Sequence, residues 1–219
     1  MWKDLNYAWQ EAFSLAWESF KKNTIPIGAV IVDENEKIIS RGRNRIFDTS
    51  SSNPLAGTGM AHAETTAMLT LKRDEHINIK KYTLYTTMEP CPMCFGAMVM
   101  VGIRNVKYAA RDGYAGATEL NDKTSYIKGK NMSISRENEE LEAFQICLQS
   151  AYEYKSRHSI AQAVLDSWSE YCSCGILLAK ELYEEGYFQN ALSICKPIEE
   201  VYDEIINRLY KGESFEKVI

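Results

Sequence analysis

The chain has 219 residues, of which 45% are hydrophobic and 25% charged, and its formal net charge at pH 7 is −5. This length suits one globular domain, or one domain with a smaller appended one, and the composition excludes a disordered chain. Residues 151–219 hold 7 Lys and Arg against 12 Asp and Glu, so the first 150 residues are neutral, with 18 residues of each sign. This balance disfavours an extended nucleic-acid surface, which draws on basic residues.

The sequence predicts a cytoplasmic protein without membrane segments. The apolar N-terminal stretch 5–20 is interrupted by Asn6, Gln10, Glu11 and Glu18, so it resembles neither a signal peptide nor a membrane span. The chain has 6 cysteines, which we expect to remain reduced in an intracellular protein.

The first third of the chain predicts a helix followed by a hairpin and a loop. Residues 2–22 carry apolar side chains at helical spacing, and the β-branched segment 25–32 pairs with 37–44 around a polar turn. Asn44 then lies at the end of the second strand. Residues 45–61 are rich in Ser, Asn, Gly and Pro and form a loop, either a lid or specificity loop or a tolerated surface insertion.

Helices and strands alternate in the middle of the chain. A helix is expected from His62 to about Arg73, a strand at 82–87, a helix at 92–101, a strand at 105–110, a short strand at 131–135 and a helix at 137–154. Such alternation favours a three-layer α/β/α sandwich with a mixed sheet of about five strands.

Beyond Lys155 the strand signals end, and 160–219 predicts about three helices. We therefore divide the chain into a domain at 1–154 and an all-helical C-terminal extension at 155–219. The segment 178–192, with Gly186 at its turn, resembles half of a tetratricopeptide-type hairpin. The extension could contact a partner or a second subunit, or could pack on the first domain.

A metal centre is predicted from two short motifs. His62 precedes Glu64 by two residues, and Cys91 and Cys94 follow in a Cys-x-x-Cys run that begins after Pro90. One imidazole and two thiolates provide three ligands for Zn²⁺ and leave a fourth position open for water, as in catalytic sites. Bound zinc lowers the pKa of that water to about 7.

Glu64 gives this centre a proton carrier, because it lies near the metal without being a ligand. A structural zinc site would need a fourth protein ligand and would leave Glu64 without a role. A further alternative is a zinc-stabilised scaffold that has the catalytic residues but does not use them.

The pattern of histidine, glutamate and Cys-x-x-Cys is typical of zinc nucleobase deaminases. Residues 5–150 resemble the cytidine deaminase-like superfamily, in the branch of bacterial tRNA adenosine deaminases and guanine deaminases. The segments that carry this resemblance are 25–32, Gly42-Arg43-Asn44-Arg45, Ala61-His62-Ala63-Glu64, 83–91 and Ala110-Arg111-Asp112. The resemblance implies a sheet of about five strands and a homodimer.

The resemblance also implies which residues bind the substrate. The position of Asn44 contacts the base or nucleoside in the family. Gly28, Ala29 and Ala63 are further expected contacts. Asp112 and Tyr114 follow a strand and are expected to line the substrate side.

The predicted function is hydrolytic removal of an exocyclic amine from a nucleobase, with release of ammonia. The resemblance implies a purine, because both nearest families act on purines. The lack of a basic excess in the catalytic part favours a free base, nucleoside or nucleotide over tRNA. Deamination of adenosine to inosine in tRNA is the alternative, because local basic patches could form from Arg41, Arg43 and Arg45 with Lys72, Arg73, Lys80 and Lys81.

Overall fold

A computed structural model describes residues 1–49 and 52–211. The elements follow in the order η1 (Trp2–Asp4), α1 (Tyr7–Lys21), β1 (Gly28–Val32), β2 (Ile38–Arg43), α2 (Ala63–Met68), η2 (Ile79–Lys81), β3 (Thr83–Met88), α3 (Pro92–Val101), β4 (Asn105–Ala110), η3 (Thr118–Asp122), α4 (Ser125–Lys128), β5 (Ser133–Arg136), α5 (Glu139–Ser156), α6 (Ala161–Glu184), α7 (Tyr187–Ser193) and α8 (Ile198–Lys211).

The centre of the molecule is a mixed sheet of five strands in the order β2-β1-β3-β4-β5. β1 is antiparallel to both β2 and β3, while β3, β4 and β5 are parallel to one another. All five residues of β1 are buried, as expected for a strand covered on both faces. Because β3 and β4 are parallel neighbours, their carboxyl ends lie side by side at the same end of the sheet. This is where α/β folds commonly bind ligands.

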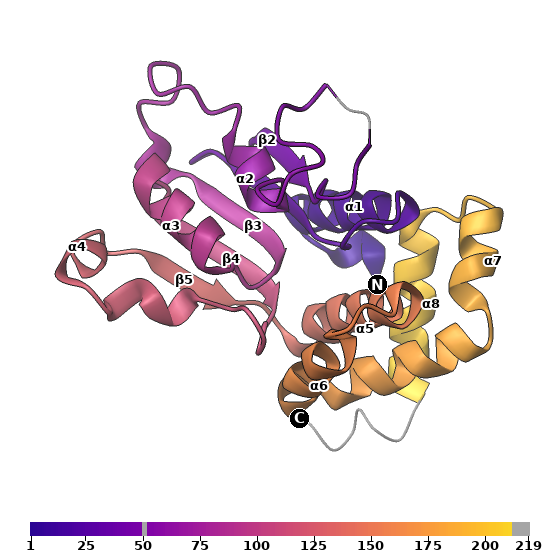
Figure 1. Ribbon diagram of the computed structural model, residues 1–219. Helices are drawn as coiled ribbons and strands as arrows, with labels where there is room; N and C mark the ends of the chain where they lie inside the picture. Colours follow the sequence, from indigo (N-terminus) through magenta and orange to yellow (C-terminus); the bar gives the residue numbers. More distant parts are fainter. Residues whose placement is uncertain (50–51, 212–219) are drawn as a thin grey trace.

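Helices cover both faces of the sheet, which confirms the expected α/β/α sandwich. α1 and α5 pack on one face, and α2 and α3 on the other (Figure 1). Apolar side chains along α1, such as Trp9, Phe13 and Trp17, are almost fully buried. Asn6 caps α1 by accepting a hydrogen bond from the backbone N–H of Ala8 at 2.7 Å.

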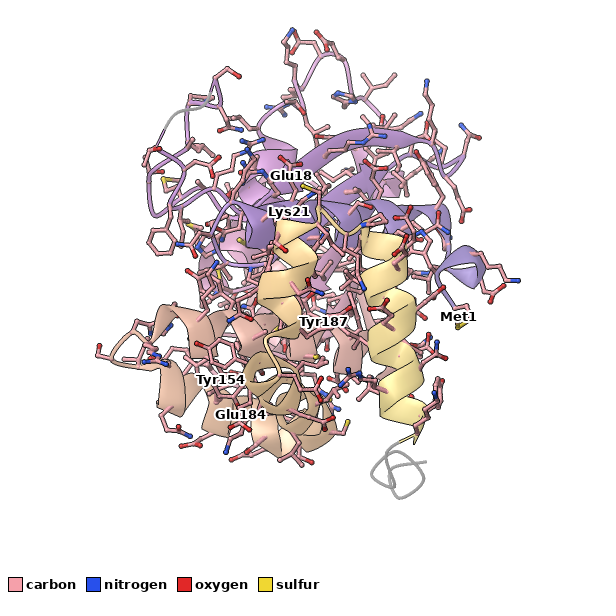
Figure 2. All side chains as sticks on the ribbon, turned by 90° about the vertical axis from the view of Figure 1, so that its right-hand side faces the viewer. Met1, Glu18, Lys21, Tyr154, Glu184 and Tyr187 are labelled. Atoms are coloured by element: carbon pink, nitrogen blue, oxygen red, sulfur yellow. The ribbon has the colours of Figure 1, made fainter. Side chains whose placement is uncertain are left out.

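The C-terminal helices extend the α1 and α5 layer. In Figure 1 they lie together beside α1 and α5, away from α2 and α3. Figure 2 looks onto them, with Tyr187 of α7 and Glu184 of α6 labelled. The rings of Phe20 on α1 and Phe188 on α7 are 5.4 Å apart, and Tyr202 on α8 packs 4.7 Å from Phe144 on α5. One hydrophobic core thus joins α6, α7 and α8 to α1 and α5.

The turn between α6 and α7 lies at Gly186, as expected, with a left-handed backbone at φ 72°. The proposed domain boundary after residue 154 falls inside α5. The expected final helix continued to Ile219, but residues 212–219 lie outside the described residues. Within the part of the chain that the structure describes, no helix is long and apolar enough to cross a membrane.

Two predicted helices are too long. The helix expected at 2–22 begins only at Tyr7, because Leu5 has an extended backbone between η1 and α1. The expected helix from His62 to Arg73 is only the six-residue α2, ending at Met68. The carbonyl of Ala67 accepts a hydrogen bond from Ser40 Oγ at 2.6 Å, and the N–H of Leu71 donates to Met68 O at 3.0 Å. In a continuing α-helix the N–H of Leu71 would donate to the carbonyl of Ala67. Here that N–H closes a tighter turn, and the hydroxyl of Ser40 on β2 occupies the carbonyl instead.

Candidate active site

The three predicted metal ligands lie at the starts of two helices on the same face of the sheet. His62 is the N-cap of α2 and Cys91 the N-cap of α3, both with extended backbone. Pro92 occupies the first turn of α3, where its missing N–H has no cost. Cys94 follows in the same turn. Each ligand is therefore placed by local backbone geometry that its own short motif specifies.

The distances between the ligand atoms fit Zn²⁺. Cys91 Sγ and Cys94 Sγ each lie 3.6 Å from His62 Nδ1, and the three ligand atoms lie within 4.8 Å of one another. With Zn–S near 2.3 Å and Zn–N near 2.0–2.1 Å, a tetrahedral site has an S···N edge of about 3.6 Å. The donor set of one imidazole and two thiols also matches zinc chemistry. These three residues could hold the metal without rearrangement.

Electrostatics within the cluster favour a thiolate at Cys91. The hydrogen bond from Cys94, with a further contribution from His62, lowers the pKa of Cys91 to about 4 although burial opposes this. The same hydrogen bond, together with burial, raises the pKa of Cys94, so without metal the two thiols share one proton. A thiolate is the form that binds metal.

Glu64 lies beside the metal ligands in a position suited to carrying protons. Its side chain is 3% exposed, and Oε2 lies 3.4 Å from Cys94 Sγ. The hydroxyl of Thr86 on β3 donates to Oε1 at 3.2 Å. Burial raises the pKa of Glu64, which makes it easier for this carboxylate to accept a proton. Such a group can act as a base and then as an acid.

Asn44 is held rigidly just after β2. Its backbone N–H donates to Ile27 O at 3.0 Å, and its carbonyl accepts from Ser19 Oγ at 3.1 Å. The side-chain Oδ1 accepts from Thr24 Oγ1 at 2.7 Å and from the N–H of Ile46 at 3.2 Å. Both side-chain bonds end on the oxygen, so the amide NH₂ is the group that could donate to a substrate.

A buried ion pair fixes the chain on either side of Asn44. Arg43 is 2% exposed and donates through Nη1 and Nη2 to both carboxylate oxygens of Asp48, at 3.1 and 2.7 Å. Burial raises the pKa of Asp48, but the hydrogen bonds and charges of Arg43 and Arg45 outweigh it and lower that pKa. The N–H of Arg45 also donates to Ala61 O at 2.8 Å. These bonds close the base of the predicted loop 45–61, of which residues 50 and 51 lie outside the described part.

Two predicted substrate contacts on β1 face opposite sides of the sheet. A Cβ on Gly28 would lie 2.0 Å from Ala12 O, so this glycine allows α1 to approach the strand. Only its main chain is left for the predicted substrate contact. Ala29 and Ala63 are fully buried together in the cluster under α2 and α3, on the side of the metal ligands.

The other two predicted contacts lie on residues 111–118, called here the loop 111–118, which connect β4 to the first residue of η3. Asp112 Oδ1 accepts hydrogen bonds from Trp168 Nε1 at 3.0 Å, from the N–H of Tyr114 at 3.1 Å and from the N–H of Ala115 at 3.2 Å. Its carboxylate is thus directed to α6. The Tyr114 side chain is 50% exposed. The structure brings together His62, Glu64, Cys91 and Cys94, whereas substrate contacts by Asp112 and Tyr114 stay predictions.

Sequence reasoning missed several supporting residues. Thr86 could have been noticed as a polar residue in a buried strand that leads to the cysteines. Glu89 follows directly after β3, and its side chain accepts from Thr118 Oγ1 at 2.5 Å and from the N–H of Asp112 at 3.2 Å. No sequence signal connects Trp168 with this loop.

Comparison with known proteins agrees with this geometry. The family model for the cytidine and deoxycytidylate deaminase zinc-binding region matches residues 3–110. A tRNA-specific adenosine deaminase of Rickettsia bellii is 39% identical over 114 residues, which are 51% of this chain and 74% of that protein. A probable cytosine deaminase of Schizosaccharomyces pombe is 36% identical over 104 residues, 48% of this chain and 58% of that protein.

A solved structure leads to the same family. It comes from a study of A-to-I editing by tRNA:A34 deaminases and superposes with a TM-score of 0.50 at 25% identity, covering 60% of this chain and 97% of that chain. The metal ligands of this chain lie within the matched residues 3–110. The chain belongs to the zinc-binding cytidine and deoxycytidylate deaminase family.

Proposed function

We propose that this deaminase acts on a small purine substrate, as a free base, nucleoside or nucleotide, and releases ammonia. Family membership makes the protein a zinc-dependent hydrolytic deaminase of a nucleobase or nucleoside. The relatives named for adenosine act on a purine, which supports a purine substrate. The charges around the site bear on whether the substrate is a small molecule or an RNA.

Three arginines near Asn44 are paired with carboxylates of the protein, and this observation supports a small substrate most directly. Arg41 pairs with Glu11 at 2.7 Å, and the buried Arg43 pairs with Asp48 at 2.7 Å. Arg45 also pairs with Asp48, at 3.1 Å. These three arginines of the predicted basic patches are thus paired with carboxylates within the protein. RNA binding depends on phosphate neutralisation by free cationic side chains, so this arrangement favours a small substrate.

The residues of the site divide the reaction between them. His62, Cys91 and Cys94 would hold Zn²⁺, which would supply hydroxide at neutral pH by lowering the pKa of water to about 7. Glu64 takes the proton of the attacking water and transfers it to the ring nitrogen beside the carbon that carries the amine. Glu64 then moves the second proton to the amine, which leaves as ammonia, while the water oxygen remains as the oxo group.

Asn44 positions the substrate in this proposal. Because its Oδ1 is occupied, its amide NH₂ would donate to an acceptor on the base or on the sugar. Because Thr24 and β2 hold Asn44 in place, its side chain loses little conformational entropy when the substrate binds.

The test is an ammonia-release assay with the zinc-loaded protein on guanine, adenine, cytosine, their nucleosides and nucleotides, and tRNA. We expect release from one small purine, with little dependence of KM on salt. Glu64→Gln should abolish release while the zinc content, measured by atomic absorption, stays at the wild-type value. Release only from a pyrimidine or only from tRNA would contradict the proposal.

The tRNA alternative is favoured by one observation, the 39% identity to the Rickettsia bellii tRNA-specific adenosine deaminase. It predicts inosine in tRNA and an affinity that falls steeply with salt, because counterions are released from each phosphate that the protein contacts. An RNA substrate would also have to present its adenine unstacked. The same assay, repeated at low and high salt, therefore separates the two substrates.

We also propose that the protein is a homodimer through the outer face of α3. Met100 on this face is 71% exposed and Val101 is 38% exposed. Tyr126 of α4 lies against Met100, with its hydroxyl 3.6 Å from Sδ. Met100→Glu should shift the mass measured by light scattering from dimer to monomer. Leu177→Glu on α6, where the residue is 62% exposed, should not change the mass.

A further inference from the structure

The loop 111–118 borders the metal centre from the β4 side. It starts at the carboxyl end of β4, next to β3, which leads to the ligand Cys91. The N–H of Ala117 donates to the carbonyl of Pro90 at 3.0 Å, and Ala117 is 3% exposed. The carboxylate of Glu89 binds the loop at Thr118 and at the backbone of Asp112. The loop is therefore hydrogen-bonded to Glu89 and Pro90, the two residues that precede Cys91.

Helix α6 holds the opposite side of the same loop. Trp168 is 2% exposed, and its indole N–H donates to Asp112 Oδ1 at 3.0 Å. The same oxygen accepts the N–H groups of Tyr114 and Ala115 and so closes the turn of the loop. Burial raises the pKa of Asp112 while the Trp168 hydrogen bond lowers it. The indole is thus a partner that helps to keep a partly buried carboxylate charged.

The backbone of the loop also touches α6 directly. A Cβ on Gly113 would lie 2.5 Å from Ser167 O and 2.8 Å from the ring of Tyr171. The guanidinium of Arg111 lies 4.7 Å from the centroid of that ring, and it binds both carboxylate oxygens of Glu142 on α5 at 2.7 Å. The loop is therefore held between the cysteine turn and the C-terminal helices.

We propose that Trp168 is a positioning residue for the substrate side of the active site, acting through Asp112 on the loop 111–118. The inference rests on the proposed function and deepens it, because it gives the C-terminal helices a role in substrate binding. Trp168 does not itself contact the reacting atoms. The metal ligands and Glu64 are positioned by α2, α3 and β3, so the loss of the indole N–H should affect substrate binding more than the chemical step.

The test compares Trp168→Phe with a matched control, Trp9→Phe. Both variants keep an aromatic ring in a buried position and lose an indole N–H that donates to a carboxylate. Trp9 is 3% exposed and donates to Glu137 Oε2 at 3.1 Å, but it lies on α1. In Trp168→Phe we expect KM to rise about tenfold, equivalent to about 1.4 kcal/mol, with kcat within about twofold and an unchanged zinc content. Trp9→Phe should leave KM unchanged.

Hydrogen exchange gives a second reading that does not depend on activity. Amides of residues 113–118 should exchange faster in Trp168→Phe than in the wild type or in Trp9→Phe. If the wild-type protein deaminates none of the purines in the panel, the proposed function fails, while this exchange result still decides whether Trp168 positions the loop. Equal exchange in the two variants, or an equal change of KM in both, would overturn the proposal.

A backbone variant covers the case in which Trp168→Phe does not fold. Gly113→Ala adds a methyl group against Ser167 O and so separates the loop from α6 without altering Trp168. We expect the same rise in KM and the same faster exchange in residues 113–118. A wild-type KM and wild-type exchange in Gly113→Ala would show that contact with α6 does not position the loop.

Discussion

The buried pair of Arg43 and Asp48 allows a prediction whose size follows from the structure. Asp48→Asn keeps the shape of the side chain but removes the charge that Arg43 pairs with, while Arg43 stays 2% exposed. Breaking a buried ion pair from one side costs about 3–5 kcal/mol. Glu18 remains as a partner for Arg43 at 3.1 Å, so we expect the lower end, about 3 kcal/mol.

The assay is thermal and urea unfolding of the zinc-loaded protein. For a chain of this length, about 3 kcal/mol corresponds to a decrease in the unfolding midpoint of about 6–12 °C. The matched control is Glu11→Gln, which removes the partner of Arg41, a side chain that is 47% exposed. Exposed pairs of this kind contribute about 0–1 kcal/mol, so the control should change the midpoint little. Equal midpoints for the two variants would refute the reasoning.

The same comparison has a pH dependence of known sign. The pKa of Asp48 is lower in the folded protein than its ordinary value, so its contribution is fully present above the pKa of the unfolded chain, near 3.9. The contribution is lost as pH falls through the folded pKa. The stability difference between wild type and Asp48→Asn should be constant between pH 6 and 8 and decrease below about pH 4. A difference that grew on acidification would contradict this assignment.

Three further predictions concern the sheet, the proton carrier and the metal. Gly28→Ala places a methyl group 2.0 Å from Ala12 O and should lower the free energy of unfolding in urea by about 3 kcal/mol. Gly96→Ala, where a methyl group meets nothing within 4 Å inside α3, should raise it by about 0.5–1 kcal/mol; a loss in both variants would count against this packing argument. Thr86→Val removes the hydroxyl that donates to Glu64 and should lower kcat/KM about tenfold at unchanged zinc content, whereas wild-type kinetics would show that Glu64 does not need this donor. Removing zinc with a chelator should stop ammonia release and lower the unfolding midpoint, since zinc at 1,000 times its dissociation constant stabilises by about 4.1 kcal/mol; persistence of both values without metal would exclude a zinc site.

The elements that the sequence predicted well are those with strong local signals. The helix at 92–101 and the strand at 105–110 have the predicted bounds. For the helix the signals are local, because Pro92 lies in its first turn and Gly102 ends it with a left-handed backbone. The helix that begins after His62 was predicted too long. Its end depends on a hydroxyl from Ser40 on a neighbouring strand, which no pattern within residues 62–73 contains.

In the site, too, local motifs could be predicted and contacts between distant segments could not. His62, Cys91 and Cys94 could be predicted because each motif specifies a helix start, and the metal requires only that the two starts meet. Thr86 could not be assigned to Glu64, which is 22 residues away, because alternation in a strand predicts burial without naming a partner. The same holds for Arg41 and Arg43 in β2 and for Arg45 after it, because the sequence shows these arginines but not the carboxylates that pair with them.

The sequence by itself determined the chemistry of this protein, since a His-x-Glu motif and a Cys-x-x-Cys motif specify a zinc centre with a proton carrier through local spacing alone. Only the tertiary structure decided what surrounds that centre. It joined Trp168 to Asp112 across 56 residues, placed α6 to α8 in one core with α1 and α5, and neutralised the arginines beside Asn44. The physical reason is that hydrogen bonds, ion pairs and apolar contacts between distant segments depend on how the layers pack, whereas ligand spacing depends on the backbone of a single turn.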